Sequence, residues 1–372
     1  MDPDKVFCHN PDCYARGKIG HGNIGVHSRK DQRYICHECN KTFTESKGTT
    51  FYCLKYPQEF VTQMITLLSR GCPIQAIVAA FGLDERTVAD WQRRAGEHCQ
   101  QVHEYMVQKP RDLGQVQADE IRVKHQGGIF WMAMALAVST RLWLGGVVSA
   151  CRDRNLIVLL IEHVFACVLY RPLLFCVDGL SAYVSAIQQV FRIPVITNKR
   201  GRPHLKDWEH LCIVQVIKQR CSGRVTGVIR RTAQGTTNQV RCLLSQTQNT
   251  LQAHVSYIER LNGTFRSRIA GLIRRGRCLV RHQETIHQAM YLVGSVYNFC
   301  CSHNSLRLVL YLADNSRHWV PRTPAIAAGI TDHIWTVSEL LNYQVPLPSW
   351  EPPKLRGRPS KHIKELIERW IS

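Results

Sequence analysis

Three carboxylates in different sequence contexts are the residues of this chain best suited to metal chemistry. Asp119 lies near the end of a predicted strand in VQADEIRV, Asp178 directly follows the apolar run LLFCV, and Glu259 lies in the predicted helix VSYIERLNGTFRSRI. An acid that ends a buried strand is costly to leave unpaired, so it commonly binds a metal ion or another cation. Oxygen ligands on separate elements suit two magnesium ions, one activating a water or a hydroxyl and one stabilising the leaving oxygen of a phosphoryl displacement.

The competing interpretation is that the three acids are surface or ion-paired residues. Glu259 lies off the apolar stripe of its predicted helix, on the same side as Asn262 and Arg266, which favours a shared site over simple surface exposure. Glu120 is adjacent to Asp119. Because neighbouring strand residues face opposite sides, we expect only one of these two acids to enter the site.

Cysteine spacing in the first 50 residues predicts a structural zinc ion. The sequence contains a C-x4-C pair and a C-x2-C pair, which are Cys8 with Cys13 and Cys36 with Cys39. Two such knuckles converge four thiolates on a tetrahedral ion, which orders a segment too small to have its own core. His9 and His37 are alternative ligands. The competing interpretation is four incidental reduced thiols among the 16 cysteines of the chain, the others being small core residues.

The segment GCPIQAIVAAFGLDERTVADWQRRAGEH predicts a helix-turn-helix. We expect one helix from Pro73 to Phe81, a break at Gly82, and a second helix that Asp84 caps and that ends near Ala95. The side chains of the second helix that would face a major groove are Glu85, Arg86, Thr87, Asp90, Gln92 and Arg93. A plain αα-hairpin has the same pattern.

The charge balance favours a polyanionic partner. Lys and Arg total 48 against 28 acids, which gives a formal charge of +20 and a pI of about 9.5. The longest apolar stretches, 129–140 and 156–177, are too short or are interrupted by charge and proline, so we expect no membrane partner. The N-terminus shows no apolar h-region of a secretion signal, and we therefore expect a cytoplasmic protein.

The motif RGRP occurs twice, with Arg200 and Arg202 in one copy and Arg356 and Arg358 in the other. An extended RGR segment can lie along a narrow minor groove, where negative potential is concentrated. A solvated basic linker is the competing interpretation. The run IRRGRCLVRH at 273–282 is more typical of a phosphate clamp at a helix end. Such contacts set affinity and register more than base specificity.

Composition along the chain predicts a multidomain α/β protein. Residues 1–50 would form a zinc ribbon, 57–108 a helix-turn-helix domain, 111–310 a catalytic core with an insertion at about 198–250, and 315–372 a basic C-terminal tail. Within the core, β-branched and aromatic runs between turn signals predict a mixed sheet flanked by helices. The predicted strands are 115–124, 128–138, 142–150 and 173–178, and the predicted helices are 156–169, 182–191 and 254–299. A hairpin is expected near 222–224.

Three strands, a helix, a fourth strand, a helix and then an acid-bearing helix is the order of a ribonuclease-H-like core. The sequence resembles the DDE transposases and integrases of prokaryotic insertion sequences, and looks most like the group named after insertion sequence one. The resemblance covers nearly the whole chain and is most specific around Glu259. The matching motifs are ADE at 118–120, VDGLSAY at 177–183, YIERLNGTFRSRI at 257–269, YNFCCSHNSLR at 297–307 and RTPAIAAGITDHIWTVSELL at 322–341.

The resemblance implies a catalytic triad that binds two Mg²⁺ or Mn²⁺ ions, made of Asp119, Asp178 and Glu259. It also implies neighbouring phosphate contacts, by Arg260, Asn262, Arg266 and Arg268. Such an enzyme binds the terminal repeats of its mobile element, cuts the 3′ ends and joins them to target DNA. We therefore expect double-stranded DNA as partner, a homodimer or larger assembly, and a prokaryotic cytoplasm in association with the nucleoid. The alternative is a catalytically inactive, transposase-derived DNA-binding regulator.

Overall fold

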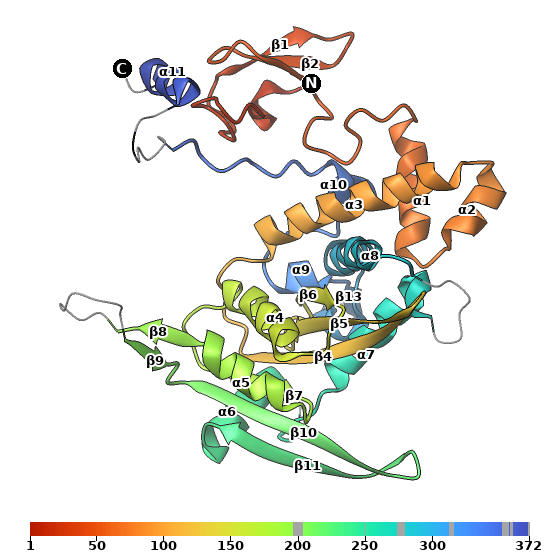
Figure 1. Ribbon diagram of the computed structural model, residues 1–372, viewed down its shortest axis with the longest axis vertical. Coiled ribbons are helices and arrows are strands. Elements are labelled where there is room, and N and C mark those ends of the chain that lie inside the picture. Colours follow the sequence, from red (N-terminus) through yellow and green to blue (C-terminus); the bar gives the residue numbers. More distant parts are fainter. Residues whose placement is uncertain are drawn as a thin grey trace. The chain divides into compact units, whose positions relative to one another are not determined.

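The computed structural model describes residues 1–195, 204–248, 250–273, 280–311, 316–351, 357 and 360–370. Its contacts divide the chain into two compact units, Met1–Gln58 with Leu341–Ser372, and Glu59–Leu340. Figure 1 shows the elements in chain order. Within the described ranges, no helix combines the length and the apolar character needed to cross a membrane.

The first unit is built on a small antiparallel sheet. A 3-10 turn, Pro3–Lys5, precedes strands β1 (Ile24–Ser28), β2 (Arg33–Cys36) and β3 (Thr42–Thr44), which pair in the order β1-β2-β3. Tyr34 and Phe43 stack with ring centroids 5.8 Å apart, and with Ile24 they form a core beside the four cysteines. This core is too small to carry the unit alone, which is why the cysteines are needed in it.

The C-terminal segment belongs to this first unit. Arg16 donates from Nε to the Pro348 carbonyl at 2.9 Å and from Nη2 to the Ser349 carbonyl at 3.2 Å. Helix α11 (Lys361–Trp370) ends at Trp370, whose indole N–H donates to the Asp12 carbonyl at 2.9 Å. The expected tail at 315–372 is thus divided, with its part from Leu341 onward folded against the N-terminal sheet.

The second unit begins with three helices, α1 (Gln58–Ser69), α2 (Ile74–Phe81) and α3 (Glu85–Met106). Gly82 ends α2 with a positive φ of 64°, and Asp84 caps α3 by accepting from the Arg86 and Thr87 N–H groups at 2.9 and 3.3 Å. The expected end near Ala95 is wrong, because the apolar stripe of α3 continues to Val102. Gly96, the residue after the expected end, packs its backbone against Gln288 of α8 (Gln283–Ser295).

A mixed sheet organises the rest of the unit. Its described strands are β4 (Gln115–His125), β5 (Gly128–Ala137), β6 (Trp143–Ser149), β7 (Leu173–Val177), β10 (Leu211–Cys221) and β11 (Arg224–Gln234), in the order β11-β10-β7-β4-β5-β6. Strands β4, β5 and β6 are antiparallel neighbours, whereas β7 is parallel to β4 and β10 is parallel to β7. The predicted mixed α/β architecture is therefore confirmed, as is the hairpin turn at Ser222 and Gly223.

Helices cover both faces of this sheet (Figure 1). Helices α4 (Arg154–Ala166) and α5 (Ser181–Val190) pack together on one face, and α6 (Thr237–Thr247), α7 (Ser256–Arg268) and α8 (Gln283–Ser295) on the other. The continuous helix expected over 254–299 is interrupted after Arg268, where Ile269 adopts an extended conformation. Past this break come a 3-10 turn, Ala270–Leu272, and α8, which continues as a π-helical turn, Val296–Cys300.

Short elements complete the second unit. They are the paired strands β8 (Arg192–Pro194) and β9 (Leu205–Asp207), the paired strands β12 (Leu308–Tyr311) and β13 (Arg317–Val320), the 3-10 turn Asn304–Leu306, and helices α9 (Pro324–Ala327) and α10 (Val337–Asn342). The elements β8 to β11 and α6 fall between the two helices α5 and α7. Of these, β10 and β11 are strands of the main sheet, whereas β8 and β9 pair with each other outside it.

A glycine at the contact between α8 and the sheet tests this packing. A Cβ at Gly294 would overlap the buried Trp143 ring of β6, so Gly294→Ala should destabilise the protein by about 1–3 kcal/mol. Gly263 on α7 has nothing within 4 Å of an added Cβ, so Gly263→Ala should stabilise by about 0.5–1 kcal/mol. Urea denaturation of both variants measures the difference, and equal stabilities would contradict the packing described.

Candidate metal sites

The two aspartates meet where the pairing of two adjacent strands ends. The expectation that Asp119 lies near the end of its strand is wrong, because β4 continues past it to His125. Strands β4 and β7 run parallel, and their pairing extends to Ala118 opposite Val177. Asp119 and Asp178 are the next residue of each strand, so both carboxylates emerge at the same edge of the pairing. One carboxylate oxygen from each of Asp119, Glu120 and Asp178 lies within 4.8 Å of the others. Such a group could hold a divalent metal ion.

Burial and, after it, the neighbouring acids determine the pKa of Asp119. Burial raises its pKa to about 7, and the negative charges of Glu120, Asp178 and Glu259 add to this effect. The amide of Asn262 on α7 donates to Asp119 Oδ2 at 2.8 Å, and the backbone N–H of Leu180 donates to Asp178 Oδ1 at 2.9 Å. These contacts orient the carboxylates without neutralising them, which leaves the site favourable to a cation.

Glu120 has a different environment from Asp119. Its contacts follow the expected alternation, because Glu120 accepts from the Tyr183 hydroxyl of α5 at 2.8 Å, on the face opposite to α7. Its other oxygen accepts from Arg152 Nε at 2.6 Å, and Arg152 Nη2 lies 3.8 Å from Asp178 Oδ2. The expectation that only one acid approaches the site is therefore too simple. Glu120 lies within reach, but both of its oxygens are already bound by protein groups.

Glu259 lies in the wall of the same pocket. A cavity of about 480 Å³ is lined by Asp119, Asp178 and Glu259, together with Arg152 and Lys218. The Glu259 side chain is 45% exposed and forms an ion pair with Lys218 of β10. Among the described residues, Glu259 is outside the group whose ligand oxygens lie within 4.8 Å of one another. The structure thus joins the two aspartates directly and gives Glu259 a cationic partner at the same pocket.

Three further residues, Arg152, Tyr183 and Lys218, contact the acids of this site and were not predicted from the sequence. They come from a loop before α4, from α5 and from β10, so only the sheet topology brings them to the acids. Lys218 follows the apolar residues of β10, but the sequence does not indicate its partner, because Glu259 lies 41 positions further along the chain.

The predicted DNA-binding residues fall into three groups. Arg86 and Thr87 lie in the first turn of α3, where Arg86 is exposed, whereas Arg93 is held within the helix by Asp90 at 2.6 Å and Glu97 at 2.8 Å. Of the α7 residues, Arg260 is exposed, Asn262 is buried against Asp119, Arg266 is half-buried, and Arg268 donates to Cys301 Sγ at 3.3 Å. Arg200, Arg202, Arg356 and Arg358 lie outside the described residues.

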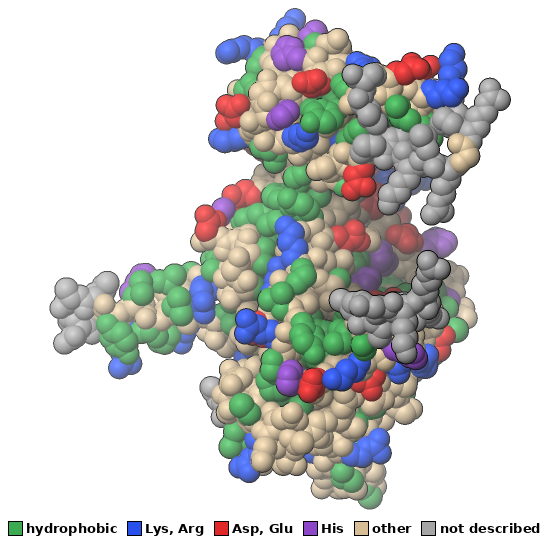
Figure 2. All heavy atoms as spheres, turned by 90° about the vertical axis from the view of Figure 1, so that its left-hand side faces the viewer, with side chains coloured by type: hydrophobic (Ala, Val, Ile, Leu, Met, Phe, Trp, Pro, Cys, Tyr) green, Lys and Arg blue, Asp and Glu red, His purple; other side chains and the backbone are tan. Residues whose placement is uncertain are grey.

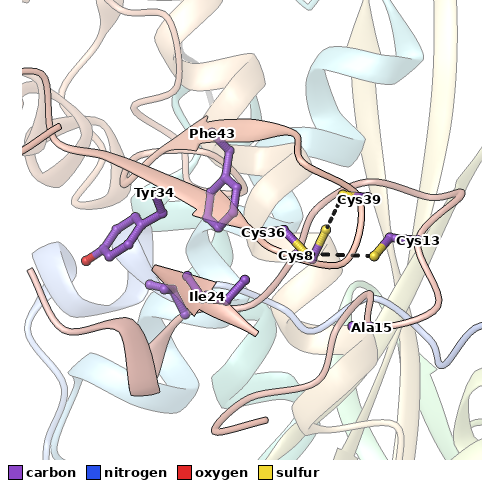
Figure 3. Close-up of a cluster of buried hydrophobic side chains, with 9 residues drawn as sticks. Cys8, Cys13, Ala15, Ile24, Tyr34, Cys36, Cys39 and Phe43 are labelled. Carbon is purple, nitrogen blue, oxygen red and sulfur yellow. Dashed lines mark hydrogen bonds between the residues drawn. The ribbon is translucent and has the colours of Figure 1, made fainter. Parts of the chain in front are cut away.

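The second cluster consists of the four predicted cysteines. The sulfur atoms point toward one another (Figure 3), with Cys8 and Cys39 Sγ 3.7 Å apart and Cys13 and Cys36 Sγ 3.8 Å apart. All four are buried free thiols, and one sulfur from each lies within 4.8 Å of the others. Burial raises the pKa of Cys13 to about 12, so four thiolates here require a compensating cation. This group could hold a zinc ion in tetrahedral geometry.

The alternative histidine ligands are not part of this cluster as described. His9 packs between the Phe7 and Phe43 rings, with centroids 4.5 and 5.2 Å away, and burial lowers its pKa to about 4. The side chain of His37 lies against Gly25 of β1. Both histidines therefore have packing roles around the cysteines.

Comparisons with known proteins add no assignment. No protein-family model matches the chain, and no curated protein matches it significantly. The two clusters and the sequence resemblance therefore carry the functional inference.

Loss of one cysteine should remove the metal. Purified Cys36→Ser protein should lose the single zinc ion that we expect per chain, because three remaining ligands bind far more weakly than four. Cys221→Ser changes an exposed thiol at the β10–β11 turn and should retain the metal. Elemental analysis measures this, and hydrogen exchange should show lost protection in β1–β3 but not in β4. Metal-free wild-type protein with a protected β2 would contradict the assignment.

Removing the positive charge at Lys218 should strengthen cation binding at the acidic pocket. The Lys218–Glu259 pair is partly exposed, so its loss corresponds to about 0.2–1 kcal/mol, or up to roughly fivefold in affinity. Lys206→Gln removes the same charge from an exposed position paired with Glu209 and should leave the affinity unchanged. Mn²⁺ titration followed by electron paramagnetic resonance measures both. A weaker affinity in Lys218→Gln would show that Lys218 supports the ion instead of competing with it.

Proposed function

We propose that this chain is a DNA transposase of the DDE type, whose carboxylates bind two divalent cations, Mg²⁺ or Mn²⁺. Asp119, Asp178 and Glu259 are the proposed ligands and catalytic residues. The enzyme would bind the terminal repeats of its element, hydrolyse the 3′ ends and join them to target DNA by transesterification. The observation that carries this proposal is the placement of Asp119 and Asp178 side by side where the parallel pairing of β4 with β7 ends, in one pocket with Glu259.

The order of elements supports a ribonuclease-H-like core. Strands β4, β5 and β6, helix α4, strand β7 and helix α5 follow one another, and α7 then carries Glu259. This is the order that the sequence resemblance implies, with β8 to β11 and α6 between α5 and α7, and of these β10 and β11 extend the main sheet. In space, the first of these strands, β4, lies at the centre beside β7, which explains how acids 59 positions apart, Asp119 and Asp178, share one site.

The side chains around the pocket suit phosphoryl transfer. Bound divalent cations would activate a water or 3′-hydroxyl and stabilise the leaving oxygen. Asn262 keeps one oxygen of Asp119 fixed, and the Leu180 N–H does the same for Asp178. Arg152 contacts both Glu120 and Asp178, so it couples the two strand ends. Lys218 satisfies Glu259 and could turn toward a DNA phosphate when a cation replaces it.

Charge and helix geometry support DNA as the partner. The net charge is +20, which favours a polyanionic partner. On the face shown in Figure 2, the Lys and Arg side chains are spread over the surface, so the support comes from the total charge and not from one basic patch on this face. Arg86 and Thr87 begin α3 after a capped turn, which is the position of base-reading residues in a helix-turn-helix. The cysteine cluster would be the zinc ribbon. Two element ends must be handled together, so we propose a dimer or larger assembly, associated with the nucleoid of a prokaryotic cell.

Conservative changes at the three acids test the enzymatic proposal. Asp119→Asn, Asp178→Asn and Glu259→Gln should each reduce strand transfer at least about 1000-fold, since each loses several kcal/mol of metal-mediated stabilisation. Binding to duplexes that carry the element termini should change little. Glu162→Gln, an exposed change on α4, is the control and should remain active.

Two outcomes would overturn the proposal in different ways. Near-normal strand transfer by Asp178→Asn would show that the catalytic residues lie elsewhere. Wild-type protein that binds the termini but never cuts them, with Mg²⁺ or Mn²⁺ present, would instead favour a transposase-derived DNA-binding regulator.

A further inference from the structure

A second pocket lies beside α7, and its lining differs in charge from that of the first pocket, which holds three acids and three cationic side chains. Its volume is about 370 Å³, and its walls come from α7, from the end of β5 with the β5–β6 turn, and from the segment after α8. Arg141, Arg260 and Arg268 line it, and none of its described lining residues is acidic. A pocket with several guanidinium groups and no carboxylate is suited to an anion.

Arg141 is held in this pocket by an unusual backbone. Its φ is 57°, in the left-handed region that non-glycine residues rarely adopt, at a cost of order 1 kcal/mol. The Tyr297 hydroxyl donates to the Arg141 carbonyl at 3.1 Å, and the guanidinium lies 3.6 Å from the centroid of the Tyr257 ring. The Arg141 guanidinium also donates from Nη1 to the Val138 carbonyl, so the surrounding structure holds this strained residue in the lining of the pocket. Strain of this kind is concentrated at functional sites.

The positive potential of the pocket is not balanced by its neighbours. Burial lowers the pKa of His303, and the charges of Arg141 and Arg260 lower it further. His303 Nδ1 lies 2.9 Å from Ser305 Oγ. Hydroxyl groups of Thr264, Ser302 and Ser305 also line the pocket. Arginine forks and hydroxyl donors together match the oxygens of a phosphate group.

We propose that this pocket binds a phosphate group of a nucleic acid strand. A pocket of about 370 Å³ lies in the range of small-ligand sites, so it accommodates a phosphate with its attached sugar and not only a bare ion. Helix α7 carries both this pocket and Glu259, and Arg260 directly follows Glu259 in sequence. The pocket therefore fixes a strand beside the carboxylates; this positioning role rests on the proposed function, whereas phosphate binding itself does not.

Binding of a short single strand to the full chain tests this inference. The probe is a fluorescein-labelled tetranucleotide, too short for duplex-binding elements, used without added divalent cations. Arg260→Gln, an exposed change, should weaken binding about tenfold and lower the salt slope by about one, because one charge-assisted phosphate contact is lost. Arg141→Lys, which keeps the charge but loses the fork, should weaken it several-fold. Arg122→Gln removes an exposed charge from β4 and should change it less than about twofold.

Further measurements locate the probe and identify its source. Hydrogen exchange should show protection of α7 and residues 297–306 by the tetranucleotide in wild type and in Asp178→Asn, but not in Arg260→Gln. This separates the pocket from the catalytic proposal, because Asp178→Asn loses activity and not binding. Equal weakening by Arg260→Gln and Arg122→Gln would overturn the inference. Inorganic phosphate that displaces the tetranucleotide and binds as tightly would overturn a nucleic acid source.

Discussion

Mutual repulsion between the carboxylates that two central strands bring together is the constraint around which the second unit is organised. Parallel pairing of β4 with β7 forces Asp119 and Asp178 to emerge together, and burial prevents water from screening them. A fold that retains such an arrangement loses stability unless other groups respond to the charge. The groups that respond are Asn262, Arg152 and Lys218, which come from elements distant in sequence.

These groups differ in whether they leave the neighbouring carboxylate oxygens able to bind a cation. Arg152 and Tyr183 bind both oxygens of Glu120, so this buried acid serves the structure of the strand end. Asn262 engages one oxygen of Asp119 and the Glu120 N–H engages the other, and neither contact neutralises the carboxylate. Lys218 binds the more exposed Glu259, where exchange for another cation costs least. Helix α7 also carries Arg260 and Arg268, which line the second pocket together with Arg141 of the β5–β6 turn.

Local patterns in the sequence predicted strands β4 to β7, the hairpin, the Asp84 cap and the cysteine cluster, because each depends on residues close in the chain. The apolar run that ends at Asp178 identified this acid for the same reason, whereas Asp119 lies inside β4 and not near its end. The Arg152–Glu120 pair, the Lys218–Glu259 pair and the packing of Arg16 against Pro348 join residues 32, 41 and 332 positions apart, so no local pattern reveals them. The length of α3 was underestimated because the helix-turn-helix pattern was followed only to Ala95, whereas the helix continues through Gly96, which packs against α8.

The central claim is that Asp119 and Asp178 bind a divalent cation jointly and that Glu259 completes the site. Anomalous diffraction at the manganese edge, from crystals of the full chain soaked in Mn²⁺, tests it most directly. The account predicts a peak within about 2.0–2.4 Å of oxygens from both aspartates, with Glu259 released from Lys218 and turned toward the ion. A saturating soak that gives no peak between Asp119 and Asp178 would contradict it, as would a peak bound by Glu120 without either aspartate.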